Sequence, residues 1–446
     1  MSLTSLGSIR GTVIHPDDAD YEHARAVWNG MVDQRPAVIV RCLDVSDVTQ
    51  AIKYAREIGV GVAIRGGGHN AAGLAVADGA LVIDLTMMRN VEVDPEKRTA
   101  RAEGGATWSD FDRATQEHGL ATTGGAISST GVAGLTLGGG LGSLMRSYGL
   151  SCDNLIAADV VTADGRLVTT SVDEQPELLW GLRGGGGNFG VVTSFTFQLH
   201  QVGEMLGGML IHPADRASEV LRFYREFTRS APDELSVFAG LMTSPEGMPI
   251  VGMVVAYNGP IEEGERVLRP LREFGPPLAD QIAPMPYTAL QTMLDEAFPP
   301  GLQVYWRSHF LRGLPDEAIE TMVDRFARVS SPLSIVLIEH LGGAVARVGR
   351  DDTAYDHRDA EYNLAIIARW PDPAMAETGI AWTRELWTSL QPHSRGVYVN
   401  YLGVGESASR VREAYGEEKY RRLAALKREY DPTNLFRFNQ NIAPGS

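Results

Sequence analysis

Ile64-Arg65-Gly66-Gly67-Gly68-His69-Asn70 contains three consecutive glycines and one histidine, which follow the apolar run at residues 60–64 after a single arginine. Glycine adopts positive φ freely and lets a backbone approach a ligand closely. Successive N–H groups in such a turn form a concavity that binds anions. The sequence therefore predicts a turn that holds a phosphate, with His69 beside the molecule that carries it.

Three more segments are dense in glycine or asparagine. Residues 131–142 read GVAGLTLGGGLG and are followed by YGLSCDN at 148–154, residues 179–192 read LWGLRGGGGNFGVV, and residues 430–442 read YDPTNLFRFNQNI. Any one of these patterns is a weak signal, whereas all four in this order are specific.

Together the four segments resemble the vanillyl-alcohol-oxidase type of FAD enzyme. More narrowly, they are similar to the berberine-bridge-enzyme-like branch and its bacterial 6-hydroxy-D-nicotine oxidase relatives, over nearly the whole chain. The resemblance implies that FAD is bonded covalently to His69, and a neutral imidazole is a competent nucleophile for that bond. The alternative is a His69 that only forms hydrogen bonds within its turn.

The resemblance also assigns the residues that bind FAD. They are Arg65, Gly66, Gly67, Gly68, Asn70 and Gly73 around His69; Thr130, Gly131, Gly134, Leu135, Gly138, Gly139, Gly140 and Gly142 in the second segment; and Leu150, Asp153, Asn154, Gly190, Val192, Asn439 and Asn441. A packed glycine-rich turn without a ligand is the alternative for the second segment.

Many relatives link the flavin a second time, through a cysteine in the second glycine segment. Alignment on Gly131 puts Ile127 at that position, so the resemblance implies a single covalent link. Cys152 lies in a different motif, and we expect it to be a buried, small apolar residue. Thr130 stands where relatives often have an apolar residue thought to influence oxygen access, which leaves reactivity with oxygen open.

Residues 185–190 match the GxGxxG pattern of dinucleotide-binding proteins. That pattern requires a strand before it and a helix after it, whereas here a predicted helix precedes and a predicted strand follows. We therefore expect no nicotinamide site, and instead close backbone packing beside the flavin.

A substrate that loses hydride from a carbon bearing OH or NH also needs a base for its proton. Tyr398 and Tyr401 match the family's YxNY pattern, and the resemblance makes Tyr401 the first candidate and Tyr398 the second. Because a free tyrosine titrates near pKa ~10, the base needs nearby positive charge or a polarised partner. Residues 396–402 are predicted as a strand, so the two rings point to opposite faces, and only one of them faces the flavin unless a bulge intervenes. Packing at a domain interface is the alternative for either ring.

Two further polar candidates lie in the predicted substrate domain. Alternation along residues 362–370 puts Asn363, Ala365 and Ile367 on one strand face, which by resemblance looks at the flavin. Asn363 is expected to bind substrate in a roomy, apolar pocket. Glu339 and His340 form a second candidate polar pair, with a structural role for Glu339 as the alternative.

The predicted fold is α+β. Residues 1–202 form an FAD-binding domain of two subdomains, residues 203–395 form an antiparallel sheet with helices on one face, and residues 396–446 return to the FAD domain. The elements behind this division are strands at 36–41, 60–64, 80–86, 191–199, 236–242, 251–257, 334–340 and 362–370, a hairpin at 155–169, and helices at 44–58, 107–117, 176–180, 214–229, 315–327 and 415–430.

Composition restricts the partners of this chain. A net charge of −16 and a pI near 5.1 disfavour nucleic acid and anionic membranes. Cys42 and Cys152 make no disulfide framework, residues 1–7 show no secretory signal, and no apolar run is long enough for a membrane span. We therefore expect a cytoplasmic enzyme. We also expect no metal, because the remaining histidines are scattered along the sequence: His15, His23, His118, His200, His212, His309, His357 and His393.

The predicted activity is hydride transfer from a small organic substrate to N5 of FAD, with molecular oxygen as acceptor and hydrogen peroxide as product. The alternatives are a dehydrogenase with another acceptor, an oxidative cyclase, or a flavin-binding module without catalysis. The sequence specifies neither the substrate nor the oligomeric state.

Overall fold

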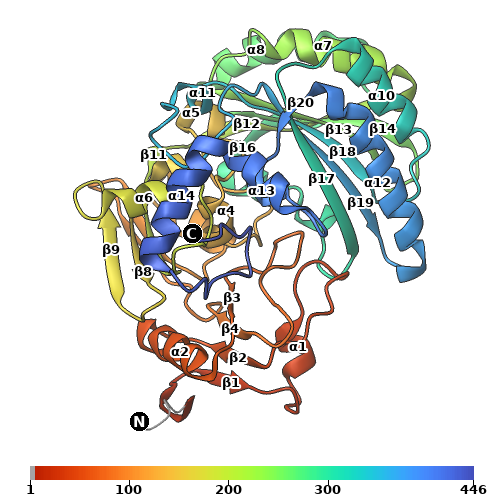
Figure 1. The fold of residues 1–446 in the computed structure, drawn as a ribbon. Helices are drawn as coiled ribbons and strands as arrows, with labels where there is room; N and C mark the ends of the chain where they lie inside the picture. Colours follow the sequence, from red (N-terminus) through yellow and green to blue (C-terminus); the bar gives the residue numbers. More distant parts are fainter. Residues whose placement is uncertain (1–5, 446) are drawn as a thin grey trace.

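A computed structural model describes residues 6–445, which form three main β-sheets (Figure 1). The expected lack of a secretory signal rests partly on residues 1–5, which lie outside this range. Within it, no helix is both long and apolar enough to cross a membrane. The same residues contain no group of three or more His, Cys, Asp or Glu side chains that could hold a metal ion.

The first sheet carries the glycine turn. Its strand order is β1 (Thr12–Ile14), β2 (Val38–Arg41), β4 (Leu81–Asp84) and β3 (Val62–Arg65), with β2, β4 and β3 parallel. Helix α2 (Val45–Ile58) connects β2 to β3, and the Asp44 carboxylate accepts its first free N–H groups. The predicted β-α-β unit is therefore confirmed. Two short helices precede β2, η1 (Leu6–Ser8) and α1 (Tyr21–Arg25).

The second sheet is antiparallel, in the order β5 (Val91–Asp94), β6 (Thr99–Glu103), β10 (Val191–Gln198), β8 (Leu155–Val161) and β9 (Leu167–Ser171). The predicted hairpin turns at Gly165, whose φ of 79° suits glycine. Thr107 and Asp110 cap α3 (Trp108–Gln116) reciprocally. The glycine run at 184–187 follows α6 (Pro176–Leu182) and precedes β10, which confirms the predicted order of helix and strand.

Short elements connect these two sheets to the rest of the chain. They are β7 (Leu120–Ala121), which pairs with β11 (His200–Gln201), and α4 (Val132–Leu137), α5 (Met145–Tyr148) and η2 (Ser151–Asn154).

The third sheet, called here the large sheet, is antiparallel and contains nine strands of the described chain. Helices α7 (Ala217–Thr228), α8 (Ile261–Glu273), α10 (Asp316–Phe326) and α12 (Ala376–Leu390) bury their apolar sides against one of its faces (Figure 1). This arrangement confirms the α+β prediction. The strands are β12 (Glu204–Pro213), β13 (Leu235–Thr243), β14 (Pro249–Tyr257), β15 (Ala279–Asp280), β16 (Ala283–Pro286), β17 (Gln303–Leu311), β18 (Ile335–His340), β19 (Tyr362–Trp370) and β20 (Ser394–Gly396).

One excursion from the large sheet reaches the N-terminal sheets. It holds α9 (Tyr287–Thr292) and η4 (Asp295–Ala297), between β16 and β17. Gln291 donates to the Asp112 carboxylate of α3 at 3.0 Å and to the carbonyl of Gly125. The other short helices of this region are η3 (Ala214–Arg216), α11 (Ala344–Arg347), η5 (Pro373–Met375) and η6 (Gln391–His393).

The segment at 396–402 differs from the sequence-based prediction. It was expected to be one strand, but β20 ends at Gly396, and η7 (Val399–Tyr401) is a 3₁₀ turn. The Asn400 amide donates to the Leu135 carbonyl at 2.9 Å and to the Tyr398 hydroxyl at 2.8 Å. The contact with α4 and the bond within the segment stabilise a turn in place of a strand.

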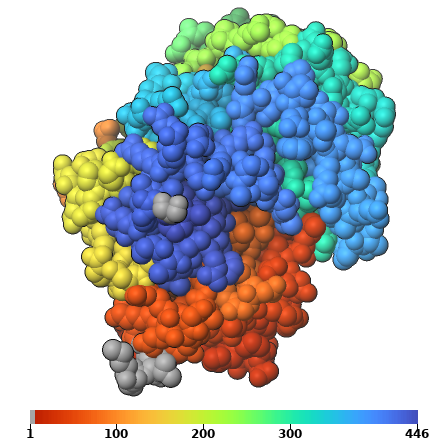
Figure 2. Space-filling model, in the orientation of Figure 1, coloured from red at the N-terminus to blue at the C-terminus, as the bar shows by residue number. Residues whose placement is uncertain are grey.

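The helix predicted at 415–430 corresponds to α14 (Glu417–Tyr430). A further helix, α13 (Ala408–Tyr415), which the sequence pattern did not indicate, precedes it, and Gly416 with a φ of 69° separates the two. In the last turn of α14 the fully buried Lys427 bonds to Asp431 at 2.7 Å and to two carbonyls, which fixes the Asp-Pro-Thr-Asn turn. Figure 2 shows this C-terminal part, in blue, lying between the N-terminal part in red and orange and the large sheet in green and cyan.

Candidate functional site

The first two glycine segments meet at the start of the site. Gly67 and Gly131 lie so close that a Cβ added to either residue comes within 2.4 Å of the backbone nitrogen of the other. Gly68, at φ 71°, faces open space, and so does Gly134. Glycine is therefore required at 67 and 131 by backbone contact, while 68 and 134 leave room for a ligand.

His69 is held on three sides. Its Nε2 lies 3.0 Å from Ser129 Oγ, and its Nδ1 lies 3.4 Å from Thr130 Oγ1. The indole of Trp28 stacks on the ring, with centroids 5.5 Å apart. Burial lowers the pKa of His69 to about 4, against an opposing effect of the Asp295 charge. The imidazole is therefore neutral near pH 7 and keeps a nucleophilic lone pair.

Glu339, Asn363 and Tyr401 form a second group on the large sheet. Glu339 is 3% exposed, accepts a hydrogen bond from the Asn363 amide at 2.5 Å, and accepts another from the Tyr401 hydroxyl at 3.1 Å. Burial raises the pKa of Glu339 to about 7, although both hydrogen bonds oppose this shift. The carboxyl therefore changes its charge near neutral pH, which is a property of acid–base groups in enzymes.

Among the residues that the structure describes, no positively charged neighbour is a main influence on the pKa of Tyr401. Burial raises the pKa of Tyr401, and the nearby Glu339 raises it further. What the structure provides is a polarised partner, because the Tyr401 hydroxyl donates directly to a carboxylate. The ring also packs on Trp306, with centroids 4.5 Å apart.

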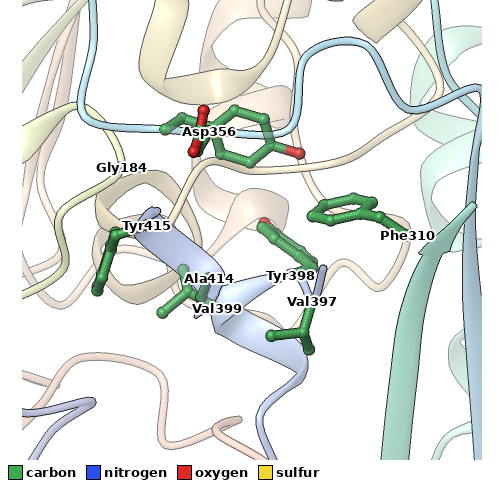
Figure 3. A pocket seen from close by; sticks show the side chains of 9 residues that line it. Gly184, Phe310, Asp356, Val397, Tyr398, Val399, Ala414 and Tyr415 are labelled. Carbon is green, nitrogen blue, oxygen red and sulfur yellow. The ribbon is translucent and has the colours of Figure 1, made fainter. Parts of the chain in front are cut away.

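Tyr398 has a different environment. Its hydroxyl oxygen accepts hydrogen bonds from the Gly140 N–H at 2.7 Å and from Asn400, and burial raises its pKa. Figure 3 shows its ring beside Phe310, lining a small pocket with Val397 and Val399. Because of the 3₁₀ turn, the ring centroids of Tyr398 and Tyr401 lie only 4.9 Å apart. The prediction that the two rings point to opposite faces is therefore wrong.

His340 was considered as a partner of Glu339. The alternation of β18 turns it away, toward Arg146 at 3.4 Å and toward the Tyr362 ring on the helix-covered face. Of this pair only Glu339 belongs to the site.

The rest of the site wall is apolar. Trp28, which is 7% exposed, packs in one cluster with Ala365 and Ile367 of β19. This cluster connects the His69 side to the Glu339 side, since Tyr401 also packs against it. Its other members are Val304, Phe298, Leu302, Trp306 and Leu337.

Several residues expected to bind FAD have protein partners in the structure. An added Cβ would collide with a neighbour at each of five glycines. The pairs are Gly138 with Asn400, Gly139 with Tyr355, Gly140 with Ser151, Gly142 with the Gly124 carbonyl, and Gly190 with Val160. Asp153 forms a buried ion pair with Arg358 at 2.6 Å, and Asn154 bonds to Tyr148, Leu150 and His200. Close packing thus accounts for these positions within the protein.

The remaining expected residues line the turn or its supports. Asn70 Oδ1 accepts the N–H groups of Ala72 and Leu74, and Gly73 packs on Val32. Gly66 lies against Gly104, and the Leu135 carbonyl accepts from Asn400. Leu150 and Val192 are buried in the core, as is Cys152.

Comparison with known proteins gives consistent results over almost the full chain. Residues 36–171 match the family described as FAD binding domain, and residues 397–443 match berberine and berberine like. (R)-6-hydroxynicotine oxidase of Paenarthrobacter nicotinovorans is 36% identical over 98% of this chain and 97% of that protein. An FAD-linked oxidoreductase of Dictyostelium discoideum is 33% identical over 98% and 95%.

The chain belongs to the berberine-bridge-enzyme-like branch of the vanillyl-alcohol-oxidase type of FAD-linked oxidoreductases. A solved structure of 6-hydroxy-D-nicotine oxidase from Arthrobacter nicotinovorans superposes with a TM-score of 0.90 at 32% identity, covering 99% of both chains. This FAD-linked oxidoreductase therefore has FAD as its cofactor, and its fold is that of the family.

The residues of this berberine-bridge-enzyme-like protein fit FAD. Among the described residues, buried side-chain atoms without a hydrogen-bond partner include Arg65 Nε and Nη2, Asn439 Oδ1, Asn441 Oδ1 and Thr136 Oγ1. Buried polar atoms normally have partners, so these atoms, with open space at Gly68 and Gly134, suit a large polar cofactor.

Sequence reasoning missed several residues of the site. Ser129, Trp28, Trp306 and Asn400 contact its members but were not selected, and neither was Asp295, which bonds to Ser128 beside Ser129. The position next to Thr130 was a signal for Ser129, and the YxNY pattern already contained Asn400. No local signal pointed to Trp28 or Asp295.

Proposed function

We propose that this FAD-linked oxidoreductase carries FAD tethered through His69 and oxidises a largely apolar organic substrate at a C–H next to an OH or NH group. The supporting observation is a single apolar cluster. On one side of it lies the neutral His69 with Trp28, and on the other side lies the Tyr401–Glu339 pair.

When bound, FAD would supply the redox chemistry, as acceptor of the hydride and as source of electrons for the reduction of molecular oxygen to hydrogen peroxide. Tyr401 and Glu339 handle the proton. The Tyr401 oxygen accepts the substrate proton as its own proton passes to Glu339 Oε1, which is 3.1 Å away. Glu339 is the final acceptor because its pKa is about 7, whereas Tyr401 has a raised pKa.

Asn363 orients the substrate beside this pair. Its amide nitrogen is engaged by Glu339, but its Oδ1 is buried and has no partner among the described residues. That oxygen is available to accept a hydrogen bond from a substrate O–H or N–H. Asn363 also keeps the Glu339 carboxylate in place, so it serves both substrate and base.

The wall composition defines the body of the substrate. Trp306, Leu337, Ala365 and Ile367 offer the substrate mostly apolar contact. A sugar brings a hydroxyl on nearly every carbon, and each buried hydroxyl without a partner costs roughly 1–3 kcal/mol. An aryl or alkyl alcohol or amine with one reacting polar group suits this wall, and a carbohydrate does not.

A dehydrogenase that uses another electron acceptor is the second candidate. It is favoured by Thr130, whose hydroxyl lies 3.4 Å from His69 Nδ1 at the position thought to influence oxygen access. The rate at which air reoxidises the reduced protein separates the two, since an oxidase recovers its oxidised absorption within its turnover time.

The first experiment is an absorption spectrum before and after acid precipitation. We expect yellow colour that stays with the pellet in the natural sequence and is released in His69→Ala. Colour that is released from the natural protein would remove the tether but keep FAD. A peroxide-coupled screen of aryl alcohols, amines and oligosaccharides then tests the substrate class, and preference for oligosaccharides would contradict it.

A further inference from the structure

The two supports of the His69 ring, Trp28 and the loop at 128–130, are both held by one segment of the large-sheet half, residues 295–304. We propose that this segment positions His69 for attachment to FAD, with Trp28 and Asp295 as positioning residues. This inference rests on the proposed tether. It assigns to the substrate-binding half a role in maturing the cofactor site.

Segment 295–304 holds Trp28 through both its side chain and its backbone. Its backbone N–H donates to the Gly68 carbonyl at 3.1 Å, which ties it to the glycine turn. Its indole N–H donates to the Phe298 carbonyl at 3.2 Å, and its own carbonyl accepts from Gly301 at 2.9 Å. The stacked ring over His69 therefore keeps its plane only while residues 298–301 are in place.

The residues next to Trp28 add four more hydrogen bonds to β17 and the turn before it. Asn29 exchanges two hydrogen bonds with the backbone of Val304, at 2.9 and 3.0 Å. Gly30 donates to the Leu302 carbonyl at 2.8 Å and accepts from the Gln303 amide at 3.0 Å. These bonds link the N-terminal segment to the large sheet.

Asp295 holds the other support. Its Oδ1 accepts the Ser128 N–H at 2.9 Å, and its Oδ2 accepts the Ser128 hydroxyl at 2.6 Å. Ser129 and Thr130, which follow directly, place their hydroxyls at the two ring nitrogens of His69. One carboxylate thus fixes the backbone that sets both hydrogen bonds of the imidazole.

Orientation matters here because attachment is a bond-forming step with a strict angle of approach. An imidazole nitrogen bonds to the C8α methyl carbon of FAD, and the C–H bond there breaks. The electron pair of the broken C–H bond reduces the flavin ring, which also takes up the proton from that bond and the proton from the imidazole N–H. Dioxygen then reoxidises the flavin and is itself reduced to hydrogen peroxide. Misplacing a reacting group by about 1 Å costs a rate factor on the order of 10².

The chain offers a matched control for the Trp28 stack. Trp387 stacks on His309 with centroids 5.2 Å apart, and its indole N–H donates to the Ser308 carbonyl at 3.3 Å. This second stack lies on the helix-covered face of the large sheet. Asp372 is the control for Asp295, since its carboxylate accepts the N–H of Ala374 at an exposed turn.

The test measures attachment separately from binding. The full chain, purified from flavin-limited cells, is mixed with FAD in air, and the acid-stable flavin is followed over time beside the total bound FAD. We expect Trp28→Ala and Asp295→Ala to bind FAD and to attach it roughly 10–10²-fold more slowly. Trp28→Phe and Asp295→Asn recover part of the rate, while Trp387→Ala and Asp372→Ala behave as the natural protein.

Each other outcome counts against a defined statement. Attachment at the natural rate in both alanine variants overturns the positioning role while the tether stands. Loss of FAD binding itself in these variants, with the controls intact, overturns it as well, because the effect is then on affinity. A natural protein that never forms acid-stable flavin removes the tether itself, and with it the inference.

Discussion

The two faces of the large sheet are built from alternate residues of the same strands, yet they differ in kind. On β19 the helix-covered face presents Leu364 and Ile366 to a continuous apolar core. The opposite face presents Asn363 beside Glu339, then Ala365 and Ile367. A single strand thus carries the apolar core on one side and, in the proposed function, the chemistry on the other.

This contrast teaches which kind of burial marks a function. Every residue of β19 is buried, so burial alone does not separate the two faces. A carboxyl group whose pKa is raised to about 7 does separate them, since it lies next to a tyrosine and to an amide whose oxygen has no partner within residues 6–445. Such an arrangement is costly for folding and is expected where catalysis needs it.

The largest effect is expected on the site face. Glu339→Gln keeps the shape of the side chain but removes the final proton acceptor, so kcat should fall by roughly 10²–10⁴-fold. The melting temperature should change little. Steady-state kinetics on the fully flavin-loaded protein measures this, and a variant with more than a tenth of the natural kcat would return Glu339 to a structural role.

On the opposite face the effect is expected in stability. Leu364→Ala removes a fully buried side chain and should lower the free energy of unfolding by roughly 2–5 kcal/mol. Turnover per folded, flavin-loaded molecule should remain near the natural value. Urea unfolding with kinetics on the folded fraction tests both, and a large loss of kcat would mean that the two faces are not independent.

The pH dependence of turnover follows from the raised pKa of Glu339. Only the carboxylate accepts a proton, so kcat should be constant above an apparent pKa of about 7. Below that value it should fall by about tenfold per pH unit as Glu339 becomes protonated. In Glu339→Gln this inflection should disappear. A natural protein that is fully active at pH 5 would contradict the assignment.

A comparison of the two tyrosines contains the smallest expected effect, that of Tyr398→Phe on activity. Tyr398→Phe leaves the buried Gly140 N–H without its acceptor, which should cost about 1–2 kcal/mol of unfolding free energy and little activity. Tyr401→Phe should lower activity strongly and change the unfolding free energy little, because it breaks the contact with Glu339. Parallel thermal melts and kinetics of the two variants compare them, and equal losses of activity would restore Tyr398 as a candidate base.

Where the determinants were local, the sequence predicted the fold well. The Asp164-Gly165 hairpin, the Thr107 cap and the alternation of residues 362–370 all depend on near neighbours. The strand expected at 396–402 failed because Tyr398 and Asn400 bond to Gly140 and Leu135, far away in the chain. Local alternation carries no information about such contacts.

The difference between local and distant contacts also explains which site residues the sequence indicated and which it did not. Glu339, Asn363 and Tyr401 were selected individually, and the structure brings them together. Trp28 and Asp295 were not, since they act across 270 and 167 residues of sequence. Nothing in the residues around either one indicates these distant contacts.

The C-terminal return also affects how the protein is made. Strand β3 is an edge of the first sheet, and its Val62 N–H pairs with the carbonyl of Leu435. About 370 residues separate the two, so at ribosomal speeds of roughly 5–20 residues per second that edge waits tens of seconds for its cover. During synthesis the strand that leads into the glycine turn is an open edge, and such edges invite pairing with other chains. We therefore expect the nascent protein to be most prone to aggregation before residue 435 emerges.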